Sequence, residues 1–191
     1  PVDDLAACLQ IACSRDSRAI DVGRVNDRFF INVASAGFGA EITATTPVKM
    51  KKALGGGAYA LMGLVKAANL SPYPVRLSVK GEEPAEGAML FMAVGNNRFA
   101  GGGFAVAEHS SMEDGLLDLT AVLHGSGLDL ARLKREMEDP FSRDNQNIFY
   151  RQFEEFTIES DNKLHCNLDG EPYLKRKLSF SVLPAHLKVV F

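Results

Sequence analysis

The 191 residues suffice for one domain with a substantial core, because a chain of this size buries about 70% of its unfolded surface and needs no disulfide or metal to fold. Apolar residues make up 46% and charged residues 24%, which is typical of a globular protein and not of a disordered one. The net charge of −3 excludes a global attraction to nucleic acid. The longest apolar stretch, residues 88–94, is far too short to span a bilayer.

The N-terminal segment predicts an amphipathic helix with one apolar face: Leu5, Cys8, Leu9, Ala12 and Cys13. On such a face cysteine serves as a small buried hydrophobe, with a reactive thiol at Cys8 as the alternative. The third cysteine is Cys166, and an odd count without a CxxC pair argues against a disulfide framework or a zinc site. This cysteine usage fits a reducing, cytoplasmic compartment. The N-terminus carries acidic residues early and lacks a signal-peptide layout.

Two strands are predicted next, at residues 19–25 and 28–34, joined by a hairpin turn at Asn26–Asp27. Gly37 and Gly39 follow and permit close backbone approach or a positive φ. Pro47 suits a helix start, and the spacing up to residue 70 predicts two helices broken at Gly55–Gly57.

Strands dominate the rest of the chain. Residues 87–95 are continuously apolar and predict a buried central strand, and residues 128–137 predict a short helix. Further strands are expected at residues 74–80, 115–124, 147–152, 155–160, 165–170, 177–184 and 186–191. About nine short strands with turn signals between them, and about three helices, predict a mainly β fold, a two-sheet β-sandwich with a few inserted helices. We expect one domain over residues 1–191, and its abrupt start suggests a chain cut from a larger protein.

Two glycine runs invite a phosphate-binding interpretation, but neither Gly55–Gly57 nor Gly101–Gly103 fits the known phosphate-loop patterns. The second run lies in a long loop between two strands, and such loops are often functional, although a plain surface loop is the alternative. Within the same loop, Asp114–Gly115 is either a simple turn or a site for a hard cation such as Mg²⁺. Such a cation would bind the carboxylate and backbone carbonyls freed by a tight glycine turn.

The stretch Asp169–Gly170–Glu171 separates two strand-like runs. Asp-Gly between strands is a strong hairpin signal, so this segment is either only a hairpin tip or a device that presents two carboxylates for chemistry. The basic run Lys175–Lys177 follows. It is either a solvated hairpin tip or a contact for anionic lipids.

Four stretches occur in order: residues 19–42, 95–104, 113–119 and 167–172. Together they resemble the C-terminal domain of the diacylglycerol-kinase-like lipid kinases, especially the bacterial YegS-like branch, from about Ile20 to Phe191. The resemblance implies a two-domain plan in which an N-terminal α/β domain binds the ATP phosphates through a Gly-Gly-Asp-Gly-Thr loop and a C-terminal β-sandwich closes the cleft. No Gly-Gly-Asp-Gly-Thr segment occurs in this chain. We therefore expect the isolated chain to fold without binding ATP and to be inactive alone.

The resemblance also assigns site residues. It implies that Glu171 is the proton acceptor, with Asp169 beside it raising its proton affinity by like-charge repulsion. It places Mg²⁺ at the backbone carbonyls of Ser111 and Leu116 and the carboxylate of Asp114. Five residues are expected near the substrate cleft: Gly37, Asn96, Gly101, Gly102 and Gly103.

The function these motifs imply is transfer of the ATP γ-phosphate to a hydroxyl of a lipid such as diacylglycerol or phosphatidylglycerol, with Mg²⁺ and ATP as cofactors. An NAD kinase-like domain is one alternative, but the hallmark Thr-Thr-Gly-Ser-Thr-Ala-Tyr stretch is missing. A stand-alone, non-catalytic lipid-binding module is the other. The expected partners are a lipid at the membrane surface and the protein's own N-terminal kinase domain, and not nucleic acid. We expect a cytoplasmic protein that can bind the membrane peripherally, and the oligomeric state stays open between monomer and dimer.

Overall fold

The computed structural model describes residues 4–14, 17–37, 71–100, 104–105, 107, 109–124 and 130–190. Strands predominate in these ranges, as predicted. In chain order the elements are α1 (Leu5–Ser14), β1 (Arg18–Val25), β2 (Arg28–Phe30), β3 (Val33–Gly37), β4 (Tyr73–Ser78), β5 (Ala85–Gly95), β6 (Phe99–Ala100), β7 (Phe104–Ala105), β8 (Leu117–Leu123), α5 (Leu130–Glu138), β9 (Ile148–Phe153), β10 (Glu155–Leu168) and β11 (Glu171–Val189).

Nine of these strands form one antiparallel sheet in the order β2-β1-β11-β10-β3-β5-β8-β9, while β4 pairs with both β10 and β5. β3 and β4 share one place in this sheet. Gly37 lies opposite Phe91 of β5, and Tyr73 lies opposite Met89 of the same strand. The two short strands therefore follow one another, in the same direction, between β10 and β5. The helices predicted within residues 47–70, and Gly39, lie outside the described residues.

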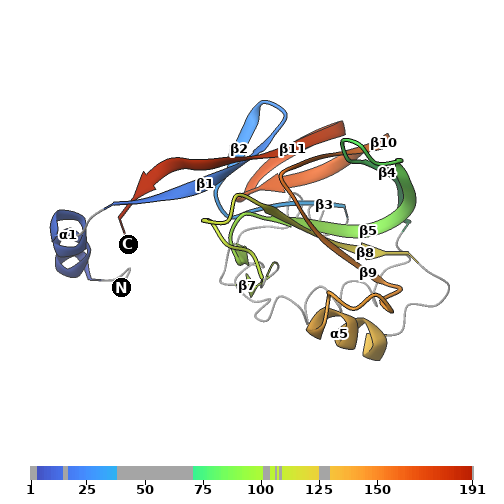
Figure 1. Ribbon diagram of the computed structural model, residues 1–191, viewed down its shortest axis with the longest axis horizontal. Coiled ribbons are helices and arrows are strands. Elements are labelled where there is room, and N and C mark those ends of the chain that lie inside the picture. Colours follow the sequence, from blue (N-terminus) through green and yellow to red (C-terminus); the bar gives the residue numbers. More distant parts are fainter. Residues whose placement is uncertain are drawn as a thin grey trace.

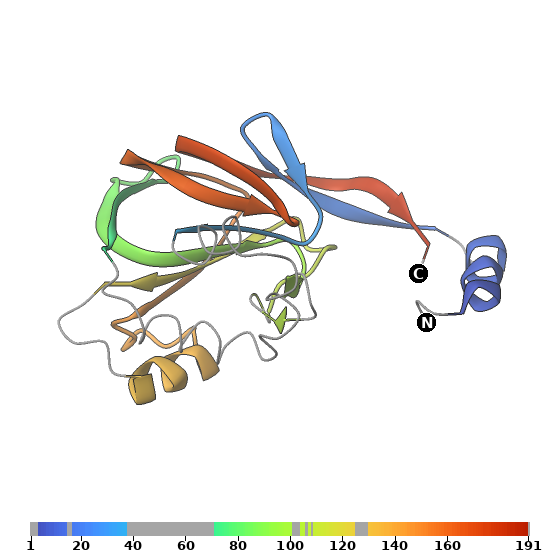
Figure 2. The ribbon, with the colours of Figure 1, turned by 180° about the vertical axis from the view of Figure 1, so that it is seen from behind.

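The sheet folds over into two layers with the main core between them. In Figure 1, β1, β10 and β11 lie above β5, β8 and β9, and Figure 2 shows from behind how β5 curves up toward β4. Strand periodicity explains the packing: alternate side chains of β10 point inward, among them Phe156, Ile158, Leu164 and Cys166. They pack against inward residues of the other layer, including Met92, Val94, Leu117 and Leu119. The predicted β-sandwich is confirmed, with its layers joined by continuous hydrogen bonding through β3 and β4.

A second, smaller core lies under α5. Leu133 of this helix is fully buried with Leu90, Val122 and Ile148, which come from β5, β8 and β9. The predicted helix at residues 128–137 is thus confirmed over Leu130–Glu138. It covers the outer face of the layer whose inner face builds the main core (Figure 1).

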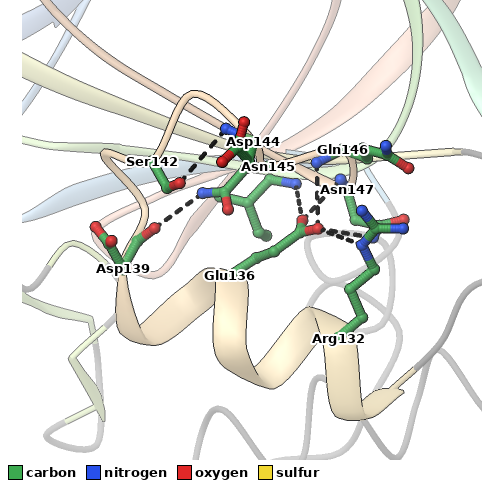
Figure 3. A network of polar contacts seen from close by, with 9 residues as sticks. Arg132, Glu136, Asp139, Ser142, Asp144, Asn145, Gln146 and Asn147 are labelled. Carbon is green, nitrogen blue, oxygen red and sulfur yellow. Dashed lines mark hydrogen bonds and ion pairs between the residues drawn. The ribbon is translucent and has the colours of Figure 1, made fainter.

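A buried carboxylate joins α5 to the segment that leads into β9 (Figure 3). The side chain of Glu136 accepts hydrogen bonds from the backbone N–H groups of Gln146, Asn147 and Ile148 at 3.1, 2.7 and 3.0 Å. Arg132, one turn earlier on the helix, donates to the same carboxylate at 2.9 Å. Burial acts to raise the pKa of Glu136, but these hydrogen bonds outweigh it and lower that pKa.

Two sequence expectations need correction in the C-terminal half. The strands expected separately at residues 155–160 and 165–170 are one strand, β10, with a register shift between Glu159 and Leu164. Likewise, residues 177–184 and 186–191 were expected as two strands, whereas β11 continues to Val189. The pairing with β1 is interrupted near Ala185, which has a φ of 49°. A register shift interrupts the alternation of apolar and polar residues although the strand continues to pair. In the sequence such a position therefore cannot be distinguished from the end of a strand.

The predicted burial of the N-terminal helix face is wrong. The helix itself exists as α1, but Leu5 is 74% exposed and Leu9 57%, and both Cys8 and Cys13 are exposed. Figure 1 shows α1 standing apart from the sheet, beyond the ends of β1 and β11. Only Cys166 is buried, and burial raises the pKa of its thiol to about 12. Within the described ranges, no helix is long and apolar enough to cross a membrane.

Candidate active site and metal loop

The turn between β10 and β11 is a two-residue hairpin turn, as predicted. Leu168 pairs with Glu171, and the two residues between them, Asp169 and Gly170, have φ angles of 48° and 106°. Positive φ at both positions is the geometry that Asp-Gly favours in a tight hairpin. The side chain of Asn167 supports it by accepting the N–H of Gly170 at 2.8 Å.

The carboxylate of Asp169 accepts hydrogen bonds from three successive backbone N–H groups, two in the link between β2 and β3 and one at the first residue of β3. Ile31 donates to Oδ2 at 2.5 Å, and Asn32 and Val33 donate to Oδ1 at 3.0 and 2.9 Å. The N–H of Asp169 in turn donates to the carbonyl of Val33 at 3.1 Å. Because both of its oxygens are engaged by backbone donors, the Asp169 side chain fixes the turn against the segment that leads into β3.

Glu171, by contrast, leaves its carboxylate open to solvent. The residue is exposed, and no hydrogen bond or ion pair joins its side chain to the part of the chain that the structure describes. Its strand is held nearby: the hydroxyl of Tyr173 accepts from Asn26 at 3.1 Å and donates to Asp27 at 2.9 Å. The Glu171 carboxylate has no partner among the described residues, while hydrogen bonds fix both its strand and the preceding turn. Such a carboxylate is suited to accept a proton from a bound hydroxyl.

Asn96, one of the expected cleft residues, is fully buried. Its side-chain amide donates to the carbonyls of Asp21 at 3.0 Å and Ile31 at 2.8 Å, and its backbone N–H donates to the carbonyl of Asn32 at 2.9 Å. The side chain therefore ties the end of β5 to the segment that Asp169 clamps. These bonds hold Asn96 between β1, β5 and the segment before β3, and its place near a substrate cleft stays a prediction.

Asp21 continues this connection toward the loop at residues 111–116. It is only 3% exposed, and its carboxylate accepts the N–H of Gly115 and the N–H of Ala185, each at 2.7 Å. Its own N–H donates to the carbonyl of Met112 at 2.7 Å. The two stretches that the sequence singled out, Asp169–Glu171 and the 111–116 loop, thus belong to one hydrogen-bonded system through Asn96 and Asp21.

The loop proposed for Mg²⁺ is tightly turned. Asp114 accepts the N–H of Leu116 at 3.0 Å, and Gly115 between them has a φ of 72°. Burial raises the pKa of the Asp114 carboxyl, and the negative charges of Asp118 and Asp21 raise it further.

Two observations bear on a cation here. The negative charges of Asp118 on β8 and Asp21 on β1 act on Asp114, and the Oδ2 of Asp118 is buried without a hydrogen-bond partner. Among the described residues, no three His, Cys, Asp or Glu side chains are grouped to hold a metal. A Mg²⁺ ion here would therefore depend on oxygens of the backbone and of water as well as on Asp114, as in the expected set with Ser111 and Leu116.

The remaining expected cleft residues are glycines. Gly37 has a φ of 92°, and a Cβ there would lie 2.7 Å from the carbonyl oxygen of Leu90, so the prediction of a positive φ and close backbone approach is confirmed. Its place in a cleft stays a prediction. Gly101, Gly102 and Gly103 lie outside the described residues.

The basic run Lys175–Lys177 lies within β11 and not at the hairpin tip, which is formed by Asp169 and Gly170. Lys177 forms an ion pair with Glu159 at 2.6 Å, and the Lys175 ammonium lies 5.6 Å from the centre of the Tyr173 ring. The placement as a hairpin tip is therefore wrong: Lys175 pairs with Leu164, several pairs along the strand from Leu168 and Glu171, and the register shift in β10 lies opposite this run.

Sequence reasoning missed Asp21 and Asp118, which are both buried. The signal was present: each is a lone acidic residue inside an apolar strand pattern, in "AIDVG" and "LLDLT". A buried carboxylate must find donors or a cation, so such a position points to a structural or binding role.

Comparison with known proteins places the chain in a family. Residues 32–191 match the family described as the YegS C-terminal NAD kinase beta sandwich-like domain. A probable lipid kinase YegS-like protein of Shewanella frigidimarina is 38% identical over 187 residues, covering 97% of this chain and 60% of that protein. The protein of the same description from Chromohalobacter salexigens is 40% identical over 181 residues, covering 94% and 57%. The chain thus spans about 60% of the length of these relatives.

Solved structures agree on the fold. A putative diacylglycerol kinase from Bacillus anthracis str. Sterne superposes with a TM-score of 0.77 at 21% identity, over 100% of this chain and 62% of that chain. A second structure described as a putative diacylglycerol kinase from the same organism gives a TM-score of 0.70 at 19% identity, over 98% and 61%. With the match over residues 32–191, the chain belongs to the YegS C-terminal NAD kinase β-sandwich-like domain family.

Proposed function

We propose that this chain is the C-terminal, substrate-side part of a lipid kinase that transfers the ATP γ-phosphate to a lipid hydroxyl. The proposal depends mainly on the different surroundings of the two carboxylates at the β10–β11 turn, those of Asp169 and Glu171. Asp169 is clamped by three N–H groups, while the carboxylate of Glu171 two residues later has no partner among the described residues. The relatives named as probable lipid kinases support the reaction class.

In this proposal Glu171 accepts the proton of the attacking lipid hydroxyl. Phosphoryl transfer depends mainly on positioning and on charge stabilisation, so the protein must supply a well-placed base and a cleft. Asp169 and Asn96 supply the placement, because together they fix the turn against the segment between β2 and β3. The substrate class is a lipid alcohol such as diacylglycerol or phosphatidylglycerol, presented at a membrane surface.

Two cofactors belong to the proposal. The ATP phosphates would be bound mainly by a nucleotide-binding domain on the N-terminal side, in the length by which the relatives exceed this chain. Mg²⁺ would be held by the carboxylate of Asp114 and the carbonyls of Ser111 and Leu116. When bound, Mg²⁺ would supply positive charge against the carboxylates of the loop and so fix its shape.

The proposal is tested by screening the complete gene product that contains this chain. Radiolabelled ATP and Mg²⁺ are incubated with vesicles that each contain one candidate lipid alcohol, and the extracted lipids are analysed for label. We expect label on one lipid class. Labelling should be lost with Glu171→Gln and kept with Glu155→Gln, a matched change of an exposed glutamate at the start of β10. An absence of label on every lipid, or full labelling with Glu171→Gln, contradicts the proposal.

A further inference from the structure

One side of β11 carries a row of polar side chains that begins at the candidate base. Glu171, Tyr173 and Lys175 each pair across the hairpin with a buried residue of β10: Leu168, Cys166 and Leu164. Directly paired residues share a face of the sheet, so the three polar side chains also lie on one side of their strand. Glu171 and Lys175 are nevertheless exposed, and Tyr173 is half-buried. A carboxylate, a phenol hydroxyl and an ammonium group thus follow one another along β11.

The turn between β1 and β2 contacts this row at Tyr173. The hydroxyl of Tyr173 donates to Asp27 at 2.9 Å and accepts from the side chain of Asn26 at 3.1 Å. The hydrogen bond from Tyr173 lowers the pKa of Asp27, and the positive charges of Lys175 and Arg28 lower it further. Two cations that come from different strands, β2 and β11, therefore lie within electrostatic reach of one carboxylate.

Arg28 and Lys175 are both exposed, and neither side chain forms a hydrogen bond or an ion pair with the residues that the structure describes. The Lys175 ammonium lies 5.6 Å from the centre of the Tyr173 ring, a contact that uses none of its hydrogen-bond donors. Lys177, two residues along the strand, differs because it pairs with Glu159 at 2.6 Å. Arg28 and Lys175 thus keep their donors for a ligand.

The charges and donors at this place suit an anion. Arg28 and Lys175 carry two positive charges, of which Asp27 offsets one. Guanidinium and ammonium groups together are a common means of binding phosphate, the first through two parallel hydrogen bonds and the second as a point charge. At a rise of about 3.3 Å per residue, the Cα atoms of Glu171 and Lys175 are about 13 Å apart. Both side chains extend several ångströms from the strand, so one small ligand can contact both.

We propose that Arg28 and Lys175 form a phosphate-binding subsite next to Tyr173 and Glu171. The inference rests on the proposed function, in which Glu171 acts on a hydroxyl that receives a phosphoryl group. Two phosphates come near that hydroxyl: the γ-phosphate of ATP, and the phosphodiester of an acceptor such as phosphatidylglycerol. Diacylglycerol has the hydroxyl and no phosphate, so a comparison of the two acceptors separates these sources.

The kinetic experiment uses the complete gene product and vesicles of zwitterionic phosphatidylcholine that contain either diacylglycerol or phosphatidylglycerol. Arg28→Gln and Lys175→Met each remove one positive charge and keep most of the side-chain length. We expect each change to lower kcat/KM about tenfold to a hundredfold, the range for a lost hydrogen bond to a charged group. A raised KM for phosphatidylglycerol alone assigns the subsite to the lipid headgroup. A lowered kcat or a raised KM for ATP with every labelled lipid assigns it to the γ-phosphate.

Two further variants separate charge from structure. Lys80→Met is the matched control, because it makes the same change at an exposed lysine after β4, and it should keep wild-type kinetics. Lys175→Arg keeps the positive charge and should retain most of the activity that Lys175→Met loses. Arg28→Gln and Lys175→Met should melt at the temperature of wild type, because neither change removes a hydrogen bond from the described structure.

A second measurement does not depend on turnover. Inorganic phosphate is titrated into the complete gene product at constant ionic strength, and the backbone amide signals of Arg28, Tyr173 and Lys175 are followed by nuclear magnetic resonance. We expect saturable shifts of these signals in the wild type. The shifts should be absent from the double variant Arg28→Gln/Lys175→Met.

Two results overturn the inference. If phosphate shifts none of these signals, or shifts them equally in the double variant, the subsite does not exist, whatever the lipid assay shows. Kinetic constants of both single variants within about twofold of wild type, with every labelled lipid, contradict it as well. If phosphate binds as expected while no lipid is labelled, the subsite stands and the proposed function fails.

Discussion

The carboxylate of Asp21 accepts the backbone N–H of Gly115 at 2.7 Å, and through this bond a side chain of β1 holds the turn that carries Asp114. The same carboxylate holds Ala185 of β11 with its other oxygen. One buried side chain thus joins the first strand, the last strand and the loop proposed for Mg²⁺.

Asp21→Asn should therefore destabilise the chain strongly. An amide offers one acceptor oxygen where the carboxylate offers two, so one of the two backbone N–H groups loses its partner in a buried place. We expect a loss of about 2–4 kcal/mol in the free energy of unfolding, measured by urea denaturation. Asp144→Asn, at an exposed position, is the control and should change it by less than about 0.5 kcal/mol. A loss as small as that of the control would show that the Asp21 bonds contribute little.

Asp169→Asn should lower stability and activity together. It removes one of the oxygens that accept the N–H groups of Ile31, Asn32 and Val33, so the turn loses its hold on the segment between β2 and β3. We expect a loss of about 1 kcal/mol, or roughly 2–4 °C in Tm for a chain of this size. An unchanged Tm with lost turnover would instead indicate that Asp169 takes part in the chemistry.

Glu171→Gln should lower activity and leave stability unchanged. The amide is nearly isosteric and the side chain has no partner in the described structure, so Tm and the KM for ATP should barely move. In the complete gene product kcat should fall by about 10²–10⁴, the usual contribution of a positioned general base. A kcat within about threefold of wild type at saturating lipid would show that Glu171 is not the catalytic base and serves only as part of the hairpin.

Stability should depend on pH through Glu136. Because its pKa is lowered in the folded state, its contribution is present above the ordinary pKa of a glutamate, 4.5, and is lost as pH falls through the lower folded value. In urea denaturation at stepped pH, wild type should therefore lose more stability below about pH 4.5 than Glu136→Gln does. Parallel curves for the two proteins would mean that the hydrogen bonds to Gln146, Asn147 and Ile148 do not favour the charged form.

Asp114→Ala should remove the response of the chain to Mg²⁺. A cation that binds only the folded state adds about 2.7 kcal/mol at a hundredfold excess over its dissociation constant. Wild type should melt at a higher temperature with MgCl₂ than with EDTA, and the variant should show no difference. If wild type melts at the same temperature with MgCl₂ and with EDTA, Mg²⁺ does not bind this loop.

The sequence predicted local features well and the connections between them poorly. The Asp-Gly turns, the central strand β5 and helix α5 are encoded in short stretches, by turn residues and by apolar periodicity, and they were found. The burial of Asn96 and the bonds of Asp21 depend on residues up to 164 positions away, which no local pattern records. The exposed face of α1 shows a second limit of sequence analysis. Apolar spacing indicates that a helix face is able to pack, but it does not say which element the face packs against.

The order of strands in the sheet has a consequence for synthesis on the ribosome. β10 and β11 follow the other described strands in the sequence, but they lie in the middle of the sheet, between β1 and β3, and the pairing of β1 with β11 extends from Arg18 to Val189. Until β10 and β11 emerge, the short β2 is the one described strand that can pair with β1, and β3 lacks its partner on the β10 side. Pairings over such long separations form slowly, and open strand edges invite pairing with other chains. The nascent protein should therefore depend on chaperones until β11 is complete, and a truncation that removes β11 should aggregate.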